Sequence, residues 1–200
     1  MDEDNVLTRL TRSFAENALQ SRLEKALKLD EYKYLTENCN PTDYEYQKRF
    51  CAMYKISGAG KSKEWKKAFF EVFAKYKKEA EKREISFEEV LRSLESKDCM
   101  SSKCEAVFAS KLLATLNPKK PILDSRVFNF FGVKIHGNNV NERVENSIEL
   151  YAEIERKYED YLQTQNAKDC ITFFDEKFPA YKSFSDIKKI DFFIWTAVQE

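Results

Sequence analysis

Two side chains in the middle of this 200-residue chain have the types and the placement to do chemistry together. Lys103 falls in the first turn of a predicted helix, where the helix dipole disfavours an ammonium group and so favours the uncharged amine. Asp124 stands at the N-cap of a second predicted helix, where backbone N–H groups keep a carboxylate ionised. An uncharged amine can attack an electron-poor sugar carbon, which a carboxylate stabilises. The alternative is that Lys103 is solvated and Asp124 only caps a helix.

The segment around these two residues must position both of them, and it predicts a helix, an extended link and a second helix. Ser102 and Glu105 have the spacing of a capping box, which predicts a helix start. Pro118 ends that helix, because the residue before a proline is disfavoured in the α region. Asp124 then begins the second helix and Gly132 ends it. One face of the first helix is apolar at helical spacing, through Val107, Phe108, Leu112, Leu113 and Leu116.

This arrangement resembles the core of the helix-hairpin-helix DNA glycosylase superfamily, especially its 8-oxoguanine glycosylase branch. The resemblance rests on Ser102-Lys103, on Pro121-Ile122-Leu123-Asp124, and on the late stretch Asp191-Phe192-Phe193-Ile194-Trp195. It implies an all-α, two-lobed domain that binds duplex DNA and excises a damaged, oxidised base. By the same resemblance, Lys103 is the Schiff-base nucleophile that attacks C1′ of a flipped nucleotide, with an accompanying lyase activity, and Asp124 assists base loss and orients the lysine.

Three alternatives stay open at the level of sequence. The family has a Gly-apolar-Gly turn that holds a DNA phosphate, and this chain has Cys99-Met100-Ser101-Ser102 there instead. The chain is therefore also compatible with a non-catalytic nucleic-acid-binding or partner-binding protein of the same fold. A helical interaction protein that binds no nucleic acid is a further alternative. Within the glycosylase hypothesis, either Lys103 or Lys111 can correspond to the family lysine.

The distribution of charge indicates where a polyanion would bind. The chain has 34 basic and 34 acidic residues, so its formal net charge is zero. Residues 61–134 hold 17 Lys and Arg against 11 Asp and Glu, a net charge of +6, so the middle of the chain is basic. The side chains expected to contact DNA are Ser101, Ser102, Lys111, Arg126, Lys66, Lys67 and Lys75.

The composition and periodicity predict one mostly helical domain. Four glycines and four prolines leave few residues for the turns of a β protein. Two lobes are expected, from residues 1–96 and 97–200. The stretch SGAGKSKEW superficially resembles a phosphate-binding P-loop, but Lys55 replaces the first glycine and a helix precedes it, which favours a loop between helices. Further helices are expected over residues 5–29, from Asn40-Pro41 to 54, 63–80, 86–94, 141–164, 167–178 and from 185 onward.

The remaining composition argues against several classes of protein. Five cysteines without a C-x-x-C pair indicate reduced thiols and a cytoplasmic location. A single histidine and unpaired cysteines make a metal site unexpected, and no cofactor motif stands out. No apolar run has the length of a membrane span. The sequence predicts no oligomeric state.

Overall fold

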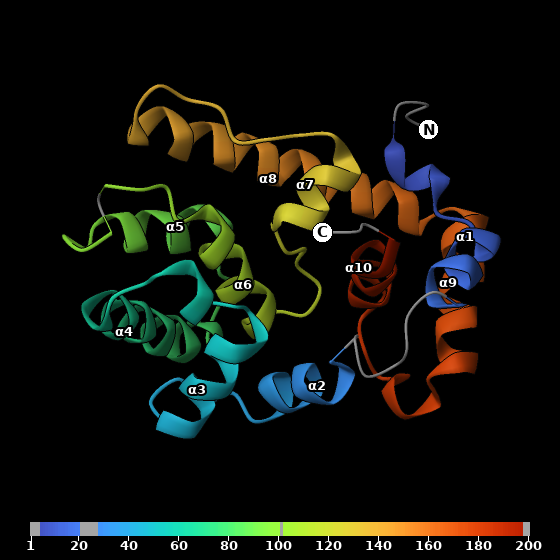
Figure 1. Ribbon diagram of the computed structural model, residues 1–200, viewed down its shortest axis with the longest axis horizontal. Coiled ribbons are helices and arrows are strands. Elements are labelled where there is room, and N and C mark those ends of the chain that lie inside the picture. The colour runs from blue at the N-terminus through green and yellow to red at the C-terminus, as the bar shows by residue number, and fades with distance from the viewer. Residues whose placement is uncertain (1–4, 21–27, 101, 198–200) are drawn as a thin grey trace.

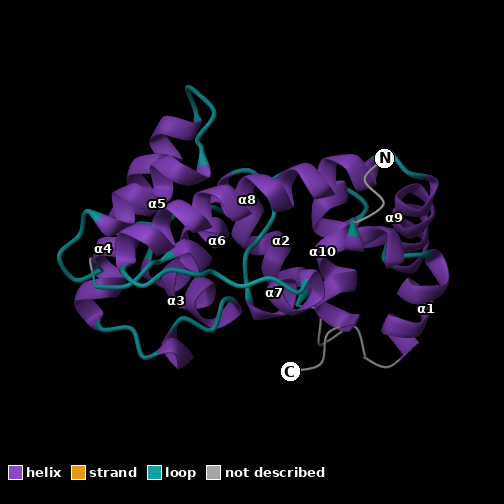
Figure 2. Cartoon of the chain, turned by 90° about the horizontal axis from the view of Figure 1, so that it is seen from above, coloured by secondary structure: helices purple, strands orange, loops and turns teal. Residues whose placement is uncertain are grey.

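The computed structural model describes residues 5–20, 28–100 and 102–197 of the chain. Every regular element in these residues is a helix, and none of them forms a strand (Figure 2). The all-α prediction is therefore confirmed. The α-helices are α1 (Arg12–Gln20), α2 (Leu29–Glu37), α3 (Tyr44–Met53), α4 (Lys63–Ala80), α5 (Phe87–Glu95), α6 (Ala106–Leu116), α7 (Ser125–Phe131), α8 (Val140–Leu162), α9 (Gln165–Lys177) and α10 (Asp186–Ala197). Short 3₁₀ turns are η1 (Val6–Arg9), η3 (Ser57–Ala59) and η4 (Pro179–Tyr181).

The helices gather in two groups, which Figure 1 shows at opposite ends of the longest axis. Helices α3, α4, α5 and α6 form one group, in which α5 packs against both α4 and α6. Helices α1, α9 and α10 form the other group, in which all three pack against one another. The long helix α8 contacts α5 in the first group and both α9 and α10 in the second. The contacts of α1 with α9 and α10, and of α6 with α4 and α5, cross the division expected between residues 96 and 97.

Local capping explains where most helices begin. Ser86 accepts a hydrogen bond from Glu89 N, and the Glu89 carboxylate accepts one from Ser86 N, so the predicted capping box opens α5. Ser62 caps α4 with its side chain alone, which accepts from Trp65 N. At the end of α7, Gly132 has a φ of 67°, in the left-handed region that glycine adopts at little cost.

The predicted helix start at Ser102 is wrong. Helix α6 begins at Ala106, with Glu105 as its N-cap residue and no side-chain cap. The Glu105 carboxylate instead accepts hydrogen bonds from Lys61 Nζ, at 2.6 and 2.8 Å, and from Trp65 Nε1, at 2.9 Å. Glu105 N donates to Glu95 Oε1 at 2.9 Å. The carboxylate and the backbone N–H of Glu105 are both bonded to groups outside this turn, so they do not form the capping box with Ser102.

The first part of the chain also differs from prediction. A single helix over residues 5–29 was expected, but the described part has η1 and then α1, because Asn5 caps the first turn and Thr11 Oγ1 accepts from Phe14 N. Residues 21–27 lie outside the described chain. Helix α2 was not predicted. Helix α3 begins at Tyr44, later than the expected Asn40-Pro41 start, because Asp43 caps it through Tyr46 N.

One continuous core joins both groups of helices, and it includes residues from Leu7 to Ile194. Phe50, Phe69 and Phe73 pack together between α3 and α4, and Phe174, Phe192 and Phe193 pack together between α9 and α10. All five cysteines are free thiols. Among the described helices, none combines the length and the apolar character that crossing a membrane requires.

Candidate active site

A pocket of about 530 Å³ lies where the α3–α4 connection, α6, the start of α7 and the end of α10 meet. Its lining contains Lys111 and Asp124, two of the side chains that the sequence singled out. Apolar and aromatic residues supply most of the remaining surface: Met53, Tyr54, Ala59, Val107, Phe108, Phe128 and Trp195. The pocket therefore combines a lysine, a carboxylate and aromatic walls, which come from four separate parts of the chain.

Lys111 is the buried amine of this pocket. It lies in the middle of α6 with only 8% of its surface exposed. Its Nζ lies 5.5 Å from the centre of the Tyr54 ring and 5.3 Å from that of Phe108, and it donates to Tyr54 O at 3.4 Å. Burial lowers the pKa of Lys111 to about 8, because it removes water from the ammonium, while the negative charge of Asp124 opposes this shift.

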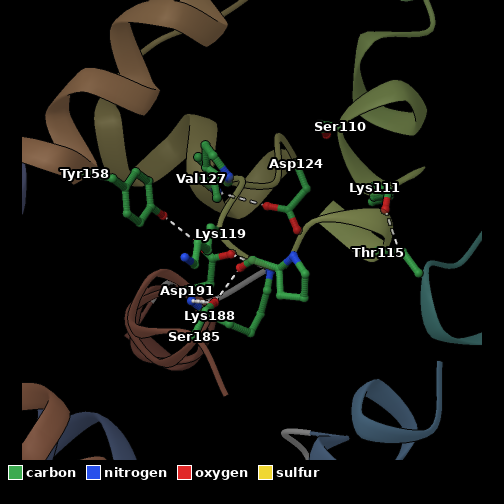
Figure 3. A network of polar contacts seen from close by, with 12 residues as sticks. Ser110, Lys111, Thr115, Lys119, Asp124, Val127, Tyr158, Ser185, Lys188 and Asp191 are labelled. Carbon is green, nitrogen blue, oxygen red and sulfur yellow. Dashed lines mark hydrogen bonds and ion pairs between the residues drawn. The ribbon is translucent and has the colours of Figure 1, made fainter. Parts of the chain in front are cut away.

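Asp124 is held at the N-cap of α7, as the sequence predicted. Its Oδ1 accepts hydrogen bonds from Arg126 N and Val127 N, each at 3.0 Å (Figure 3). The extended link before it is fixed to α6, because Leu123 N donates to Ser110 Oγ at 2.9 Å. Ser110 and Lys111 are adjacent on α6, so this hydrogen bond brings Asp124 to the same side of the pocket as the lysine. The carboxylate has a firm position and is close enough for its charge to act on Lys111.

Three further cations line the pocket: Lys28, Lys55 and Arg126. Together with Lys111 they outnumber Asp124, the one carboxylate that the described residues contribute to the lining, by four to one. Arg126 Nη1 donates to Trp195 O at 3.0 Å and so joins the start of α7 to the end of α10. Such an excess of positive charge around an aromatic-walled hollow suits an anionic ligand that also carries a flat ring.

The backbone at two of these cations is unusual. Lys28 and Lys55 have φ angles of 51° and 54°, and they are the non-glycine residues with positive φ in the described chain. The left-handed conformation costs an ordinary residue about 1–2 kcal/mol. Residues held in such conformations concentrate at functional sites. Both lie in the lining of this pocket, one just before α2 and the other just after α3.

Trp195 contributes part of the pocket wall and an indole N–H group that could donate a hydrogen bond. Its Nε1 is buried and has no hydrogen-bond partner among the described residues. An unpaired buried N–H costs free energy that a partner would recover. The neighbouring Asp191, which the sequence grouped with Trp195, does not line the pocket.

Asp191 instead belongs to a buried network between α8 and α10. Its Oδ1 accepts from Tyr158 Oη at 2.5 Å, and its Oδ2 pairs with Lys188 Nζ at 2.7 Å (Figure 3). Lys188 and Asp191 are only 2% and 1% exposed. Burial raises the pKa of the Asp191 carboxyl, and the adjacent ammonium of Lys188 opposes that shift. The network therefore joins α8 to α10, the helix that also carries Trp195.

The other residues expected at the site lie elsewhere. Lys103 and Ser102 are exposed in the turn before α6 and do not line the pocket, and Ser101 lies outside the described residues. Lys66 and Lys67 line a separate groove between α3 and α4. Lys75 lies on the exposed side of α4, with its Nζ 3.9 Å from Glu79 Oε1. Of the expected residues, the structure therefore brings together Lys111, Asp124 and Arg126.

Sequence reasoning missed three residues of the pocket, namely Lys28, Lys55 and Trp195. In the sequence, Trp195 stands out only as part of a pattern, and Lys55 only because it replaces a glycine. A lysine inside the apolar face of the predicted helix, at position 111 between Ser110 and Leu112, was the available signal for a buried amine. Nothing in the local sequence assigns Lys28 or Lys55 to this pocket, because only the fold brings them near α6.

Comparisons with known proteins add no family to this description. No family model, no curated protein and no solved structure matches the chain. No group of three or more His, Cys, Asp or Glu side chains placed to hold a metal ion occurs in the described parts of the chain. Function is therefore inferred from the pocket itself.

Proposed function

We propose that this protein binds DNA and carries out base-excision chemistry through a lysine Schiff base, with Lys111 as the nucleophile. The single observation that carries the proposal is Lys111 itself, an amine 8% exposed with a pKa of about 8, beside Asp124 in an aromatic and cationic pocket. At pH 7.5 about a quarter of an amine with this pKa is uncharged, against about one in a thousand for an ordinary lysine. The fold proposed with this chemistry is that of the helix-hairpin-helix glycosylases.

Each group in the pocket has a role in that reaction. The uncharged Lys111 Nζ attacks C1′ of an extruded nucleotide, the bond from C1′ to the base breaks as the new C–N bond forms, and the departing base takes the proton that the amine loses. Opening of the C1′–O4′ bond, with a second proton passing from nitrogen to O4′, then gives the imine. Asp124 stabilises the positive charge that develops on the sugar. Lys28, Lys55 and Arg126 supply positive charge for the flanking phosphates, and Phe108 and Phe128 supply apolar walls for the base. At an abasic site the same amine condenses with the C1′ aldehyde and releases water.

This assignment uses Lys111 where the sequence favoured Lys103. Lys103 was expected to gain its reactivity from the first turn of a helix, and that turn begins three residues later, at Ala106. Its side chain is exposed, whereas the Lys111 side chain is buried against Tyr54 and Phe108. Lys111 is therefore the better candidate for the nucleophile.

Borohydride trapping tests the proposal. The hydride reduces a lysine imine to a secondary amine and so links the protein covalently to a duplex that carries an abasic site. We expect the wild type and Lys103→Gln to be trapped, and Lys111→Gln not to be trapped although it remains folded. Trapping that is lost in Lys103→Gln and kept in Lys111→Gln would assign the reaction to Lys103 instead.

The second candidate is a non-catalytic nucleic-acid-binding protein of the same fold. It is favoured by one observation, the glycine-free stretch from Cys99 to Ser102 where the resembling family has its phosphate-binding turn. A wild type that binds duplex DNA but is not trapped on abasic or oxidised-purine duplexes at pH 8 supports this candidate and excludes the enzyme.

A further inference from the structure

A second hollow also borders the α3–α4 connection, and the proposed reaction does not use it. This groove, of about 860 Å³, runs between α3 and α4. Phe70 and Cys51 supply buried apolar surface, and Tyr44 lines it from the first turn of α3. Tyr44 is 74% exposed and is the one large hydrophobic residue of the described chain with such exposure. A solvent-exposed aromatic ring beside a groove can stack on a planar group of a ligand.

The groove is also strongly cationic. Lys48, Lys63, Lys66 and Lys67 line it, against the single carboxylate of Glu71. Lys48 has a loose, exposed pair with Glu45 at 3.6 Å. Within the described chain, the ion pairs include none for Lys63, Lys66 or Lys67. In that part of the chain these lysines therefore form no close ion pair, although the charge of Lys63 acts on the neighbouring Glu64 and Glu71 lies in the same groove.

We propose that this groove binds a single-stranded segment of nucleic acid, with a base stacked on Tyr44 and phosphates on Lys63, Lys66 and Lys67. An exposed aromatic ring between unpaired lysines is the combination that holds single strands without sequence preference. An acidic peptide would match the charge but would have no flat ring for Tyr44. A duplex keeps its bases stacked inside and likewise leaves Tyr44 without a partner.

The position of the groove fits a strand that continues toward the candidate active site. The α3–α4 connection forms part of both hollows, since Lys55 and Ala59 line the active-site pocket and Ser57 lines the groove. Strand binding in the groove does not depend on any reaction at Lys111.

Fluorescence anisotropy with a labelled oligothymidylate of about 12 nucleotides tests the inference. We expect Tyr44→Ala to weaken binding about tenfold, because it removes the ring on which one base stacks. Lys66→Gln with Lys67→Gln should weaken it further at low salt and reduce the slope of log K against log salt by about 0.7 for each phosphate that the variant no longer binds. The matched control is Lys77→Gln with Lys78→Gln, which removes the same charge from the other end of α4 and should bind like the wild type.

Three outcomes would overturn the inference. The first is equal weakening by the two double variants, which would show a response to total charge only. The second is displacement of the oligonucleotide by poly-glutamate as effectively as by unlabelled oligothymidylate, since that would show a groove for any polyanion. The third is unchanged binding by Tyr44→Ala with an unchanged melting temperature. Anisotropy reports on the groove and borohydride trapping reports on Lys111, so loss of strand binding and loss of trapping are separate results.

Discussion

At the scale of single residues, Lys111 is the feature of this protein that packing alone does not explain. An aliphatic side chain in the same place would pack without a desolvated charge. The folded state lowers the pKa of Lys111 from 10.5 to about 8, and such a shift corresponds to about 3 kcal/mol of lost stability when the amine is protonated. A buried amine that costs stability and lies beside a fixed carboxylate has the character of a functional group.

Lys111→Met should therefore stabilise the protein at pH 7, by about 1–3 kcal/mol in the free energy of unfolding. The sign follows from proton binding, because between about pH 8 and 10.5 the unfolded wild type binds more protons at this site than the folded wild type. Wild-type stability thus gains from rising pH across that window, and the advantage of Lys111→Met should shrink there. Urea unfolding at pH 7 and pH 10 measures both values. A methionine variant less stable than the wild type at pH 7 would contradict the desolvation argument.

At the scale of elements, local sequence decides a helix start only where no distant group competes for the capping side chain. Ser86 is exposed, and Glu89 accepts from Ser86 N through Oε2 while its Oε1 pairs with Arg83, so no partner takes the oxygen that the capping box needs and the box forms. The same spacing at Ser102 and Glu105 does not form one, because Lys61 and Trp65 bind the Glu105 carboxylate. The same Ser-x-x-Glu spacing therefore forms a capping box at the start of α5 and none at the start of α6.

Ser86→Ala and Ser102→Ala make a matched pair that tests this difference. Ser86→Ala should lower the free energy of unfolding by about 1 kcal/mol, because it removes an N-cap. Ser102→Ala should change it by less than about 0.5 kcal/mol, because the side chain is exposed and caps nothing. Equal losses in chemical denaturation would show that Ser102 caps α6 in solution.

At the scale of the whole molecule, a buried ionic network helps to hold α8 against α10. Lys188 and Asp191 come from α10, and Tyr158 reaches the same carboxylate from α8 (Figure 3). The Lys188 Nζ also lies 5.2 Å from the centre of the Tyr32 ring, which adds α2 to the contact. Because α10 carries Trp195 into the candidate active site, this network supports one wall of the pocket.

Asp191→Asn should destabilise the fold by about 3–5 kcal/mol, because it leaves the Lys188 ammonium buried without a counter-charge. The control is Glu153→Gln, which removes the exposed carboxylate of the pair with Lys157 at 2.9 Å and should change stability by no more than about 1 kcal/mol. Thermal and urea unfolding of the two variants compares them directly. Similar small losses of stability in both variants would show that the buried pair contributes no more to stability than the control pair.

Sequence by itself determined those parts of this protein that depend on neighbours along the chain. The helical class, the span of α4, the capping box of α5, and α7 between Asp124 and Gly132 all follow from periodicity and from hydrogen bonds within a few residues. The chemical types expected at the site, an amine and a capping carboxylate, are also present. They are short-range properties, and tertiary packing leaves them unchanged.

Only the tertiary structure decided which amine belongs to the pocket. Lys103 and Lys111 are both lysines near one predicted helix, and what separates them is burial, which depends on Tyr54 and Phe108 being packed around one of them. The start of α6 was decided in the same way, by Lys61 and Trp65, which are distant in sequence. A pKa and a competing hydrogen bond depend on which groups come within a few ångströms, and for these residues the chain makes that choice only when it folds.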